Sequence, residues 1–433
     1  MKKPFRCGPS LQILCAIAAG IVLGYVAPAR AVALRPLGDL FVDLIRLLVG
    51  PIMFCTVACG IAAMRDMRQL GEAGIKAMLY FESVSLLALA SGLAGAWLLQ
   101  PGAGFRLDQR LDQRLDQRLD QHAGALLQAP SGHTGADAVL AALHATAAHT
   151  SMLHIMLCAV ACGLALALAG ARAKRITALG ERLAGSLFLV VNLVLKAAPL
   201  AAFGAIAYTI GRYGLVSIAP LLKLLGAIYL VTGMFIAAVL GMVAHCCGFG
   251  LWRLIAYLKE ELVLVVATAS SVAAMPRLID KLGRAGCPDA LARLMVPASY
   301  AFNLNGSAVY LTLALVFLAQ AWQVELHAAD YALMLAVAML TSKGSSGIAG
   351  STFVALSATL AALPAIPAGS LLFILSIERL LKCRPLANII GNGVACLAVA
   401  AWMGTLDRGK LRASFARSEA GGEATSGTAA LQE

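Results

Sequence analysis

The residues of this sequence best suited to chemistry stand in three polar clusters inside apolar runs. In one of them Arg384, Asn388 and Asn392 are spaced four apart, so they share one face of a helix. An arginine in a lipid-embedded helix is costly and is functional by default. Its planar guanidinium suits two-point pairing with a carboxylate, and the two amides suit a cation or a polar ligand. The alternative is that Arg384 snorkels at a helix end, where Arg379 and Lys382 would mark the membrane interface.

The second cluster is the run Asn303-Leu304-Asn305-Gly306-Ser307, which has the composition of an unwound point in a helix. Glycine weakens a helix, and asparagine side chains compete for the backbone hydrogen bonds. Carbonyl oxygens exposed at such a break could replace the hydration shell of a small cation. The alternative is that these polar side chains hydrogen-bond between neighbouring helices.

The third cluster contains Ser270 and Ser271, near the end of a short apolar stretch at 262–275. Free backbone N–H groups at the tip of a break can hold an anion. The sequence shows no catalytic Ser/His/Asp or Cys/His set, because His154 and His245 lie in apolar runs without an acidic neighbour. The three clusters therefore predict a binding protein and not an enzyme.

The elements that must position these clusters are helices in a lipid bilayer. Hydrophobic residues make up 60% of the 433 positions and charged residues only 13%, whereas soluble chains are about one quarter charged. Runs of about 20 apolar residues recur, and in hydrocarbon every backbone polar group must be paired internally. The chain is therefore predicted to be an all-α polytopic membrane protein.

Charge and cysteine content exclude other classes. The formal net charge of +12 fits lysines and arginines that flank membrane spans, and no basic, aromatic-interleaved domain indicates nucleic-acid binding. Most of the eleven cysteines lie inside apolar runs. They are typical of small core residues and not of disulfides or a zinc site.

Six continuous spans are predicted, at 11–29, 38–63, 77–100, 147–170, 184–210 and 218–247. The first resembles a signal peptide, but no small-residue cleavage site closes it, so we interpret it as an uncleaved span. If each span crosses the membrane in turn, the basic residues of 64–76 and those after the fourth span lie on the side of the N-terminus. The basic tail is expected on the same side. Both termini are therefore predicted to be cytoplasmic.

After about Glu260 the apolar stretches become shorter and are interrupted, at 262–275 and at 331–370. Two broken apolar segments in one half of a chain point to a transporter binding site, because non-helical backbone at membrane depth must line a cavity or be buried in protein. The alternative is two ordinary helices with an irregular pattern.

Two other segments are unusual in composition. Residues 105–122 carry four repeats of Arg-Leu-Asp-Gln, which we interpret as a low-complexity insertion in an extracytoplasmic loop, with a partner-binding helix as the alternative. The Ser/Gly/Glu-rich end of the tail, from about Ala413, is predicted to be disordered.

Several longer motifs run from about Leu11 to Asp407. They include Arg35-Pro36-Leu37-Gly38-Asp39, Gly50 to Val57, Leu79-Tyr80-Phe81-Glu82, Gln100 to Gly104, Ala198 to Ala205, Tyr300 to Ser307 and Ser342-Lys343-Gly344. On these motifs the chain resembles the dicarboxylate/amino acid:cation symporter family, and most closely its bacterial C4-dicarboxylate transport branch. The resemblance is poor over the repeat insertion and over 123–150.

The resemblance implies eight transmembrane helices and two re-entrant helical hairpins, near 260–276 and 335–365. It also implies a homotrimer with an elevator mechanism, in which a transport domain slides against a fixed scaffold. We expect an N-terminal membrane half at 1–258, a C-terminal transport core at 259–407 and a disordered cytoplasmic tail at 408–433.

The resemblance also assigns roles to the polar clusters. The residues that would contact substrate are Ser270, Ser271, Ser307, Gly350, Arg384 and Asn388, and those of a cation site are Asn303, Asn305, Asn388 and Asn392. The tip of the second hairpin, at 347–352, would act as a gate. Amino-acid carriers of the family have an aspartate one turn before the arginine, where this chain has Leu381. A plain dicarboxylate is therefore the expected substrate.

The chain departs from the family pattern at several positions. Ala269-Ser270-Ser271-Val272 replaces Ser-Ser-Ser-Glu, and Asn305 replaces an aspartate used for cations. Glu378 replaces another aspartate and lies six residues before Arg384 instead of seven. At helical spacing one deleted residue rotates the two parts by about 100°. We therefore expect Glu378 to be displaced from the arginine site.

The expected function is import of succinate, fumarate or malate across the inner membrane, coupled to Na⁺ or H⁺ and without any cofactor. Glu82 and Glu378 are the candidate protonatable groups, and pairing or interfacial exposure is the alternative for both. The expected partners are the dicarboxylate, the bilayer and two further copies of the chain. The competing hypothesis is a diverged paralogue that senses substrate or acts as a scaffold without transport.

Overall fold

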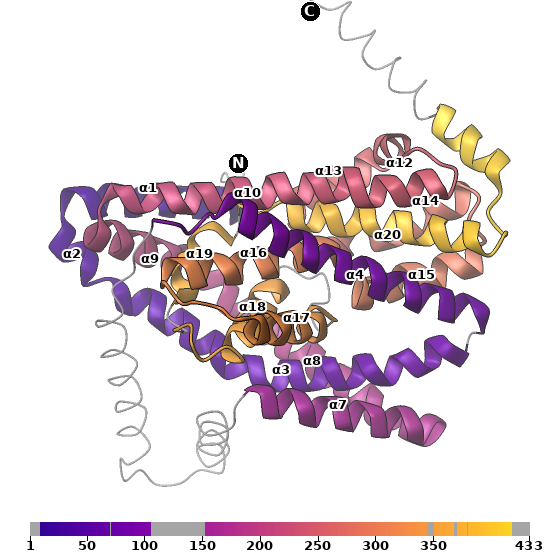
Figure 1. Ribbon diagram of the computed structural model, residues 1–433, viewed down its shortest axis with the longest axis horizontal. Coiled ribbons are helices and arrows are strands. Elements are labelled where there is room, and N and C mark those ends of the chain that lie inside the picture. Colours follow the sequence, from indigo (N-terminus) through magenta and orange to yellow (C-terminus); the bar gives the residue numbers. More distant parts are fainter. Residues whose placement is uncertain are drawn as a thin grey trace, which may run out of the picture.

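The computed structural model of the chain describes residues 9–69, 71–104, 152–343, 350–367, 370–378 and 380–417, and in these ranges every regular element is a helix (Figure 1). Five helical stretches are long and apolar enough to cross a membrane: Pro28–Ala62, Glu72–Leu99, Leu215–Cys246, Asp289–Ala321 and Cys383–Trp402. For the part of the chain that the structure describes, the predicted all-α class is confirmed. The expected count of eight spans stays a prediction.

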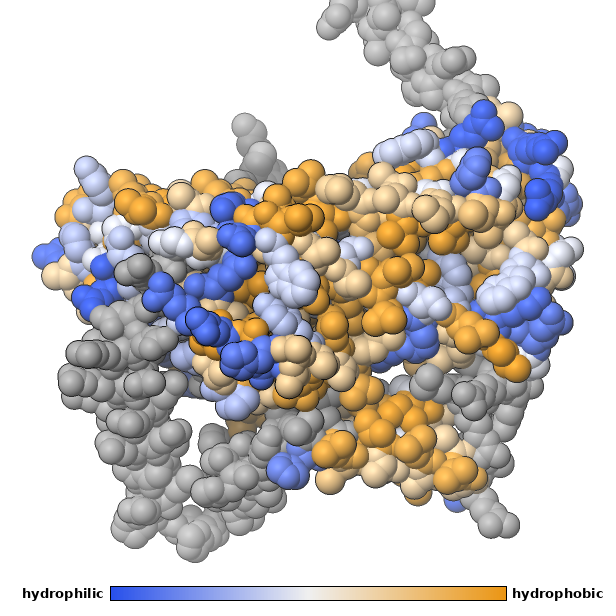
Figure 2. Space-filling view, in the orientation of Figure 1, coloured by the Kyte–Doolittle hydropathy of each residue, from blue (hydrophilic) through white to orange (hydrophobic). Residues whose placement is uncertain are grey.

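The outer surface carries an extensive apolar covering. Large hydrophobic side chains are exposed on several helices, among them Leu98, Leu168 and Val216, each more than 80% accessible. Figure 2 shows apolar residues over much of the visible face, with hydrophilic residues gathered at its upper right and left and in a band down its left centre. A soluble monomer rarely exposes such a surface, so these helices are suited to contact with lipid.

The helices of the N-terminal half are α1 (Pro9–Val26), α2 (Pro28–Val32), α3 (Arg35–Gln69), α4 (Glu72–Leu99), α7 (Met152–Ala169), α8 (Lys174–Val194) and α9 (Ala198–Tyr213). The predicted span 38–63 lies inside α3, and the predicted span 77–100 lies in α4 up to its last residue, Leu99. The predicted span 184–210 is wrong as a single helix, because α8 ends at Val194 and α9 begins anew at Ala198. Pro199 accounts for the division, since proline is accepted in the first turn of a helix but not in its interior.

The helices that follow begin with α10 (Ile218–Phe235), a π-helical turn (Ile236–Leu240), α11 (Gly241–Cys246) and α12 (Leu251–Tyr257), which complete the N-terminal half. They continue with α13 (Lys259–Thr268), α14 (Met275–Arg284), α15 (Asp289–Phe302), α16 (Asn305–Ala321), α17 (Ala328–Lys343), α18 (Ser351–Ala361), α19 (Leu371–Glu378) and α20 (Cys383–Trp402). Almost every residue of α16 and α20 is buried, so these two helices form the centre of the protein.

Each predicted interruption of the C-terminal half coincides with a break between helices. Helices α13 and α14 meet at a turn where Ala269 has a left-handed φ of 53°. Helix α15 ends at Phe302 and α16 begins at Asn305, so the predicted unwound point lies where it was expected. Helices α17 and α18 flank residues 344–349, which lie outside the described ranges. Whether the two helix pairs re-enter the membrane stays a prediction.

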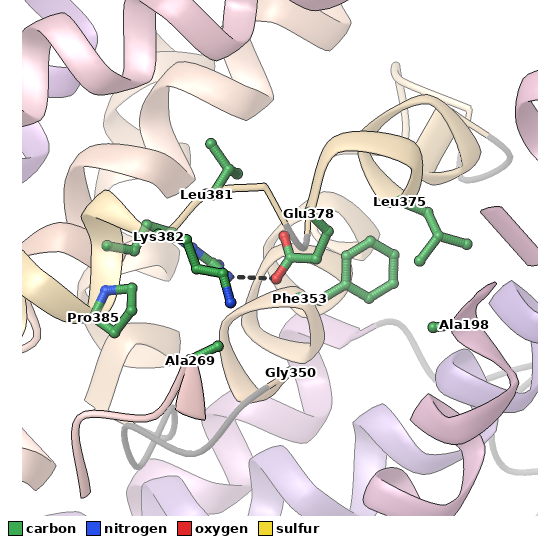
Figure 3. A pocket seen from close by; sticks show the side chains of 10 residues that line it. Ala198, Ala269, Gly350, Phe353, Leu375, Glu378, Leu381, Lys382 and Pro385 are labelled. Atoms are coloured by element: carbon green, nitrogen blue, oxygen red, sulfur yellow. Dashed lines mark hydrogen bonds and ion pairs between the residues drawn. The ribbon is translucent and has the colours of Figure 1, made fainter. Parts of the chain in front are cut away.

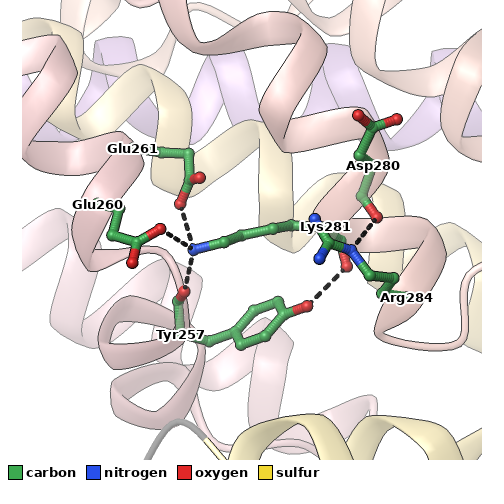
Figure 4. Close-up of polar contacts among 6 residues, drawn as sticks. All are labelled: Tyr257, Glu260, Glu261, Asp280, Lys281 and Arg284. Carbon is green, nitrogen blue, oxygen red and sulfur yellow. Dashed lines mark hydrogen bonds and ion pairs between the residues drawn. The ribbon is translucent and has the colours of Figure 1, made fainter. Parts of the chain in front are cut away.

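A cluster of charged residues joins the two arms of the first helix pair at its base (Figure 4). Lys281 of α14 lies 2.8 Å from Glu261 and 3.4 Å from Glu260, both in α13. It also donates to the backbone oxygen of Tyr257 at 3.0 Å, and the Tyr257 hydroxyl donates to the oxygen of Lys281. Because Glu261 is only 1% exposed, its charge depends on Lys281 for compensation.

The expected division of the chain at 258 does not separate the helices in space. Helix α4, from the N-terminal half, lies against α16, where Gly92 faces the oxygen of Val309 and the hydroxyl of Thr312. A side chain at Gly92 would collide with both groups, so glycine permits this close approach. The described helices thus form an interlocked body in which α4 supports the centre of the C-terminal half.

The start of the tail differs from its prediction. Residues 408–417, expected to be disordered, form a helix that we call the C-terminal helix, and its Leu411 and Phe415 are buried. The Asp407 carboxylate accepts the backbone N–H groups of Gly409 and Lys410, both at 3.0 Å. The hydrogen bond from Lys410 holds the pKa of Asp407 below its usual value. An apolar pair four residues apart and an N-terminal cap explain the helix.

Several predictions fall on residues that the structure leaves undescribed. They are the Arg-Leu-Asp-Gln repeat at 105–122, Arg379, the part of the second hairpin tip before Gly350, and the tail after Arg417.

Candidate functional site

Arg384 is the second residue of α20 and lies inside the protein. It is only 9% exposed, so the structure excludes the alternative that it snorkels to the membrane surface. Pro385 follows it in the first turn of α20, where a proline costs no intrahelical hydrogen bond because the first N–H groups have no partner. The helix start thus holds the guanidinium at a fixed, buried position.

Glu378 pairs with this arginine. Arg384 Nη2 donates to Glu378 Oε1 at 2.6 Å (Figure 3). The Tyr310 hydroxyl donates to Glu378 Oε2 at 2.8 Å. The Arg384 guanidinium also lies 4.5 Å from the centroid of the Tyr310 ring. The predicted displacement of Glu378 is wrong. Helix α19 ends at Glu378 and α20 begins at Cys383, so the two residues do not lie in one continuous helix. The spacing that is one residue shorter therefore does not rotate Glu378 away from Arg384.

The pairing leaves part of the guanidinium available. Arg384 Nε and Nη1 are buried and make no hydrogen bond to any residue that the structure describes. Buried donors without partners are costly, and their presence often marks a functional site. Nε and Nη1 lie on opposite edges of the guanidinium, so either of them can donate to a carboxylate in a two-point contact only together with Nη2, which now donates to Glu378.

A pocket of about 30 Å³ adjoins the arginine and joins the two broken segments. Its lining includes Ala269 at the break of the first helix pair, Gly350 before α18, Glu378 and Arg384 (Figure 3). Lys382 lines the same pocket, so two cationic side chains border one small space. The volume holds only one or two water molecules.

Asn388 and Ser307 connect α20 to the break between α15 and α16. The backbone N–H of Gly306 donates to Asn388 Oδ1 at 2.9 Å, and Asn388 Nδ2 lies 3.4 Å from Ser307 Oγ. The Ser307 hydroxyl lies 3.1 Å from that of Thr352 in α18. A Cβ at Gly306 would collide with the backbone oxygen of Arg384, so glycine allows the two helices to approach here.

The predicted cation-binding residues gather where the break between α15 and α16 meets α20. Asn392 lies 3.1 Å from the backbone oxygen of Asn388 and 3.2 Å from that of Asn303. Asn303 Nδ2 lies 3.4 Å from the oxygen of Gly391. Asn303 Oδ1 and both polar atoms of the Asn305 side chain are buried without a hydrogen bond among the described residues. Amide oxygens of this kind are common ligands of small hard cations.

Ser270 and Ser271 lie at the tip between α13 and α14. Ser270 N donates to Thr268 Oγ1 at 3.4 Å, and the oxygen of Ser271 accepts the Tyr300 hydroxyl at 2.7 Å. The Ser271 side chain is fully buried, and its hydroxyl has no described partner. The tip is thus tied to α15, and its Ala269 borders the arginine pocket.

Glu82 lies apart from the pocket-lining residues. It pairs with Lys343, the last residue of α17, at 2.7 Å. The structure therefore supports the pairing alternative for Glu82, as it does for Glu378. The ion pair joins α4 to the arm that leads into the second break.

Sequence reasoning missed Tyr310 and, as a pocket residue, Lys382, and it named Thr352 only as the end of the predicted gate at 347–352. Helical spacing could have revealed the first, because Ser307 and Tyr310 are three residues apart and so share one helical face. No local signal predicts the contact between Thr352 and Ser307, because it depends on the packing of α18 on α16.

Comparisons with known proteins show what this chain is similar to. The model of the Sodium:dicarboxylate symporter family matches residues 10–402. A "C4-dicarboxylate transport protein" of Burkholderia pseudomallei is 44% identical over 435 residues, covering 99% of this chain and 100% of the relative. A "C4-dicarboxylate transport protein 1" of Ralstonia nicotianae is 44% identical over 416 residues, covering 95% of this chain and 96% of the relative.

Proposed function

The chain belongs to the sodium:dicarboxylate symporter family, and on that basis we propose that it imports C4-dicarboxylates across the inner membrane together with a cation. It is a transport protein and not an enzyme. The observation that carries the proposal is the buried Arg384. Two of its nitrogens have no hydrogen-bond partner among the described residues, and it borders a pocket that both broken segments line.

The lining of the pocket favours a diacid over an amino acid. Arg384 supplies a fork for one carboxylate, and the charge of Lys382 in the same lining suits the second. Leu381 also lines the pocket and is only 2% exposed. An apolar side chain there offers no partner to a substrate ammonium group, whose burial without a partner is costly. Succinate, fumarate and malate meet these requirements.

Binding of a diacid at Arg384 requires the Glu378 side chain to move or to lose its charge. A pocket of about 30 Å³ is too small for a four-carbon diacid. A substrate carboxylate near Arg384 would also repel the carboxylate of Glu378, which now accepts from Arg384 and Tyr310. Uptake of a proton by Glu378 would relieve that repulsion and couple transport to H⁺.

The side-chain oxygens of Asn303 and Asn305, which have no hydrogen-bond partner among the described residues, support Na⁺ as the coupling ion. Together with backbone oxygens at the helix break they offer neutral ligands suited to Na⁺. The two coupling schemes therefore involve different residues, Glu378 for H⁺ and the asparagine cluster for Na⁺. Ion gradients imposed one at a time distinguish them.

The whole-molecule proposal follows the family. We propose a homotrimer in which the C-terminal helices move as a transport domain against a scaffold, with the tip near Gly350 as gate. Both termini would be cytoplasmic. Lys76, which ends the basic segment 64–76 and lies in the second turn of α4, donates to the backbone oxygen of Trp402 at 3.0 Å. This contact places that segment and the end of α20 at the same end of the protein, which supports the sidedness.

Uptake of labelled succinate into proteoliposomes tests the proposal. We expect uptake with an inward Na⁺ or H⁺ gradient, and its loss in Arg384→Ala. Arg277→Ala, which removes an exposed arginine of α14, serves as the control and should transport normally. Succinate binding without uptake under every gradient would instead indicate the non-transporting sensor or scaffold. Normal uptake by Arg384→Ala would refute the site.

A further inference from the structure

A second hollow lies apart from the arginine pocket, between the α11–α12 corner and the C-terminal helix. This cleft encloses about 550 Å³ and is lined by His245, Phe249, Arg253, Leu411, Arg412 and Phe415, among others. It shares no lining residue with the pocket at Arg384. We propose that it binds the phosphate headgroup of an anionic phospholipid.

The far wall of the cleft is held in place by specific contacts. Leu411 and Phe415 of the C-terminal helix are 3% and 5% exposed, and the Phe415 ring lies 5.7 Å from that of Tyr257. The Ser414 hydroxyl donates to the backbone oxygen of Arg284 at 3.1 Å. The C-terminal helix is therefore docked on the base of the first helix pair, and the cleft is a built feature.

The charge around the cleft is strongly positive. Residues 241–258 and 403–417 contain five basic side chains, Arg253, Arg408, Lys410, Arg412 and Arg417, and one acidic side chain, Asp407. Asp407 caps the C-terminal helix and lies 3.7 Å from Lys410. The guanidinium of Arg408 lies against Gly248, at the rim of the cleft. Four to eight basic residues next to a membrane helix are typical of anionic-lipid binding.

The position of the cleft selects a lipid over a dissolved anion. Met242, three residues before His245 on the same face of α11, is 68% exposed, and Trp252 of α12 is 70% exposed. Tryptophans favour the membrane interface, and an exposed apolar helix face suits acyl chains. Figure 2 shows hydrophilic residues over the C-terminal helix directly beside apolar surface. A headgroup in the cleft would leave its chains against that surface.

Native mass spectrometry of the full-length protein, titrated with phosphatidylglycerol or phosphatidylcholine, tests the proposal. We expect wild type to bind phosphatidylglycerol more tightly, and Arg408→Gln/Arg412→Gln to weaken that binding about tenfold while leaving phosphatidylcholine unchanged. Arg175→Gln/Arg182→Gln removes two exposed arginines of α8 and is the matched control. Equal losses in both pairs, or no loss in the first, would overturn the proposal.

Two further arms complete the test. An excess of inorganic phosphate should not displace phosphatidylglycerol, and displacement at concentrations equal to that of the lipid would show a site for free phosphate instead. If the double variant is poorly folded, as judged by size-exclusion chromatography, Arg412→Gln alone should show a smaller loss of the same selectivity. An unchanged selectivity in a folded Arg412→Gln protein would count against the cleft.

Discussion

At the scale of single residues, the site depends on one guanidinium that serves two kinds of partner. Arg384 pairs with Glu378 through Nη2, while its Nε and Nη1 are buried and have no partner in the part of the chain that the structure describes. Tyr310 fixes the other oxygen of Glu378 and places its ring against the guanidinium. Glu378 is thus held as an internal carboxylate beside the position that we assign to a substrate carboxylate.

Glu378→Gln should therefore bind succinate more tightly than wild type. Glutamine keeps the side-chain volume and an acceptor for Tyr310 but removes the negative charge that competes for Arg384. A hydrogen bond to a charged group contributes about 1.5–3 kcal/mol, so affinity should rise about tenfold or more. Isothermal titration of the purified protein measures the change.

The control for this variant is Asp280→Asn, which neutralises an exposed acid of α14 and should leave the affinity for succinate unchanged. A weaker affinity in Glu378→Gln would show that this carboxylate helps substrate binding instead of competing with it.

At the scale of elements, close approach between broken helices brings the polar residues together. Gly306 lets the start of α16 touch the start of α20, and Asn388 caps that contact by accepting the Gly306 N–H. The first helix pair is closed at its base by Lys281 and Glu261. Both contacts join segments that are far apart in the sequence and therefore set the geometry of the site.

Gly306→Ala should separate α16 from α20. The added methyl group would collide with the oxygen of Arg384, and overpacking a buried contact costs about 1–3 kcal/mol. We expect a lower melting temperature in detergent and a loss of succinate binding. Gly226→Ala is the matched control, because a Cβ at Gly226 of α10 meets no atom within 4 Å. Equal effects of the two substitutions would contradict this view of the contact.

Lys281→Met should destabilise the protein strongly. It leaves the Glu261 side chain, 2% exposed, charged and without its partner, and breaking a buried ion pair in this way costs about 3–5 kcal/mol. The melting temperature is again the measurement. The double change Glu261→Gln/Lys281→Met should recover most of the loss, because it removes both charges together.

Glu260→Gln is the comparison for this cluster. Glu260 contacts the same ammonium group but is 67% exposed in its side chain, so its removal should cost less than about 1 kcal/mol. A large effect of Glu260→Gln, or no recovery in the double variant, would show that Glu261 does not depend on Lys281.

At the scale of the whole molecule, an apolar exterior surrounds a centre that contains the polar site. Exposed leucines and valines cover the outside, while the asparagines, serines and arginine of the site are buried in α16, α20 and the helix breaks. This arrangement is the one expected of a protein whose solvent is lipid and whose ligand is polar.

The sidedness of the chain can be tested with reporter fusions. Alkaline phosphatase fused after Glu433 should be inactive, because both termini are predicted to be cytoplasmic. The same reporter fused after Gly214, between α9 and α10, should be active, because tracing the spans places this segment outside. Fluorescence of a green fluorescent protein fused after Glu433 provides the complementary readout. Activity of the C-terminal phosphatase fusion would invert the proposed topology.

The sequence by itself determined the membrane class, the helical content and the approximate places of the breaks. Apolar length, the cost of unpaired backbone in hydrocarbon and the conformational effects of glycine and asparagine act locally, so they can be read from neighbouring residues. The shared face of Arg384, Asn388 and Asn392 followed in the same way, because all three lie in the unbroken helix α20.

Only the tertiary structure decided which polar groups meet. The pairing of Glu378 with Arg384 depends on a turn between α19 and α20 that helical spacing does not describe, and Thr352 reaches Ser307 through helix packing. The docking of residues 408–417 on the first helix pair and the cleft beside it are likewise products of packing. Contacts between distant segments depend on how whole helices fit together, which residue spacing along one helix does not specify.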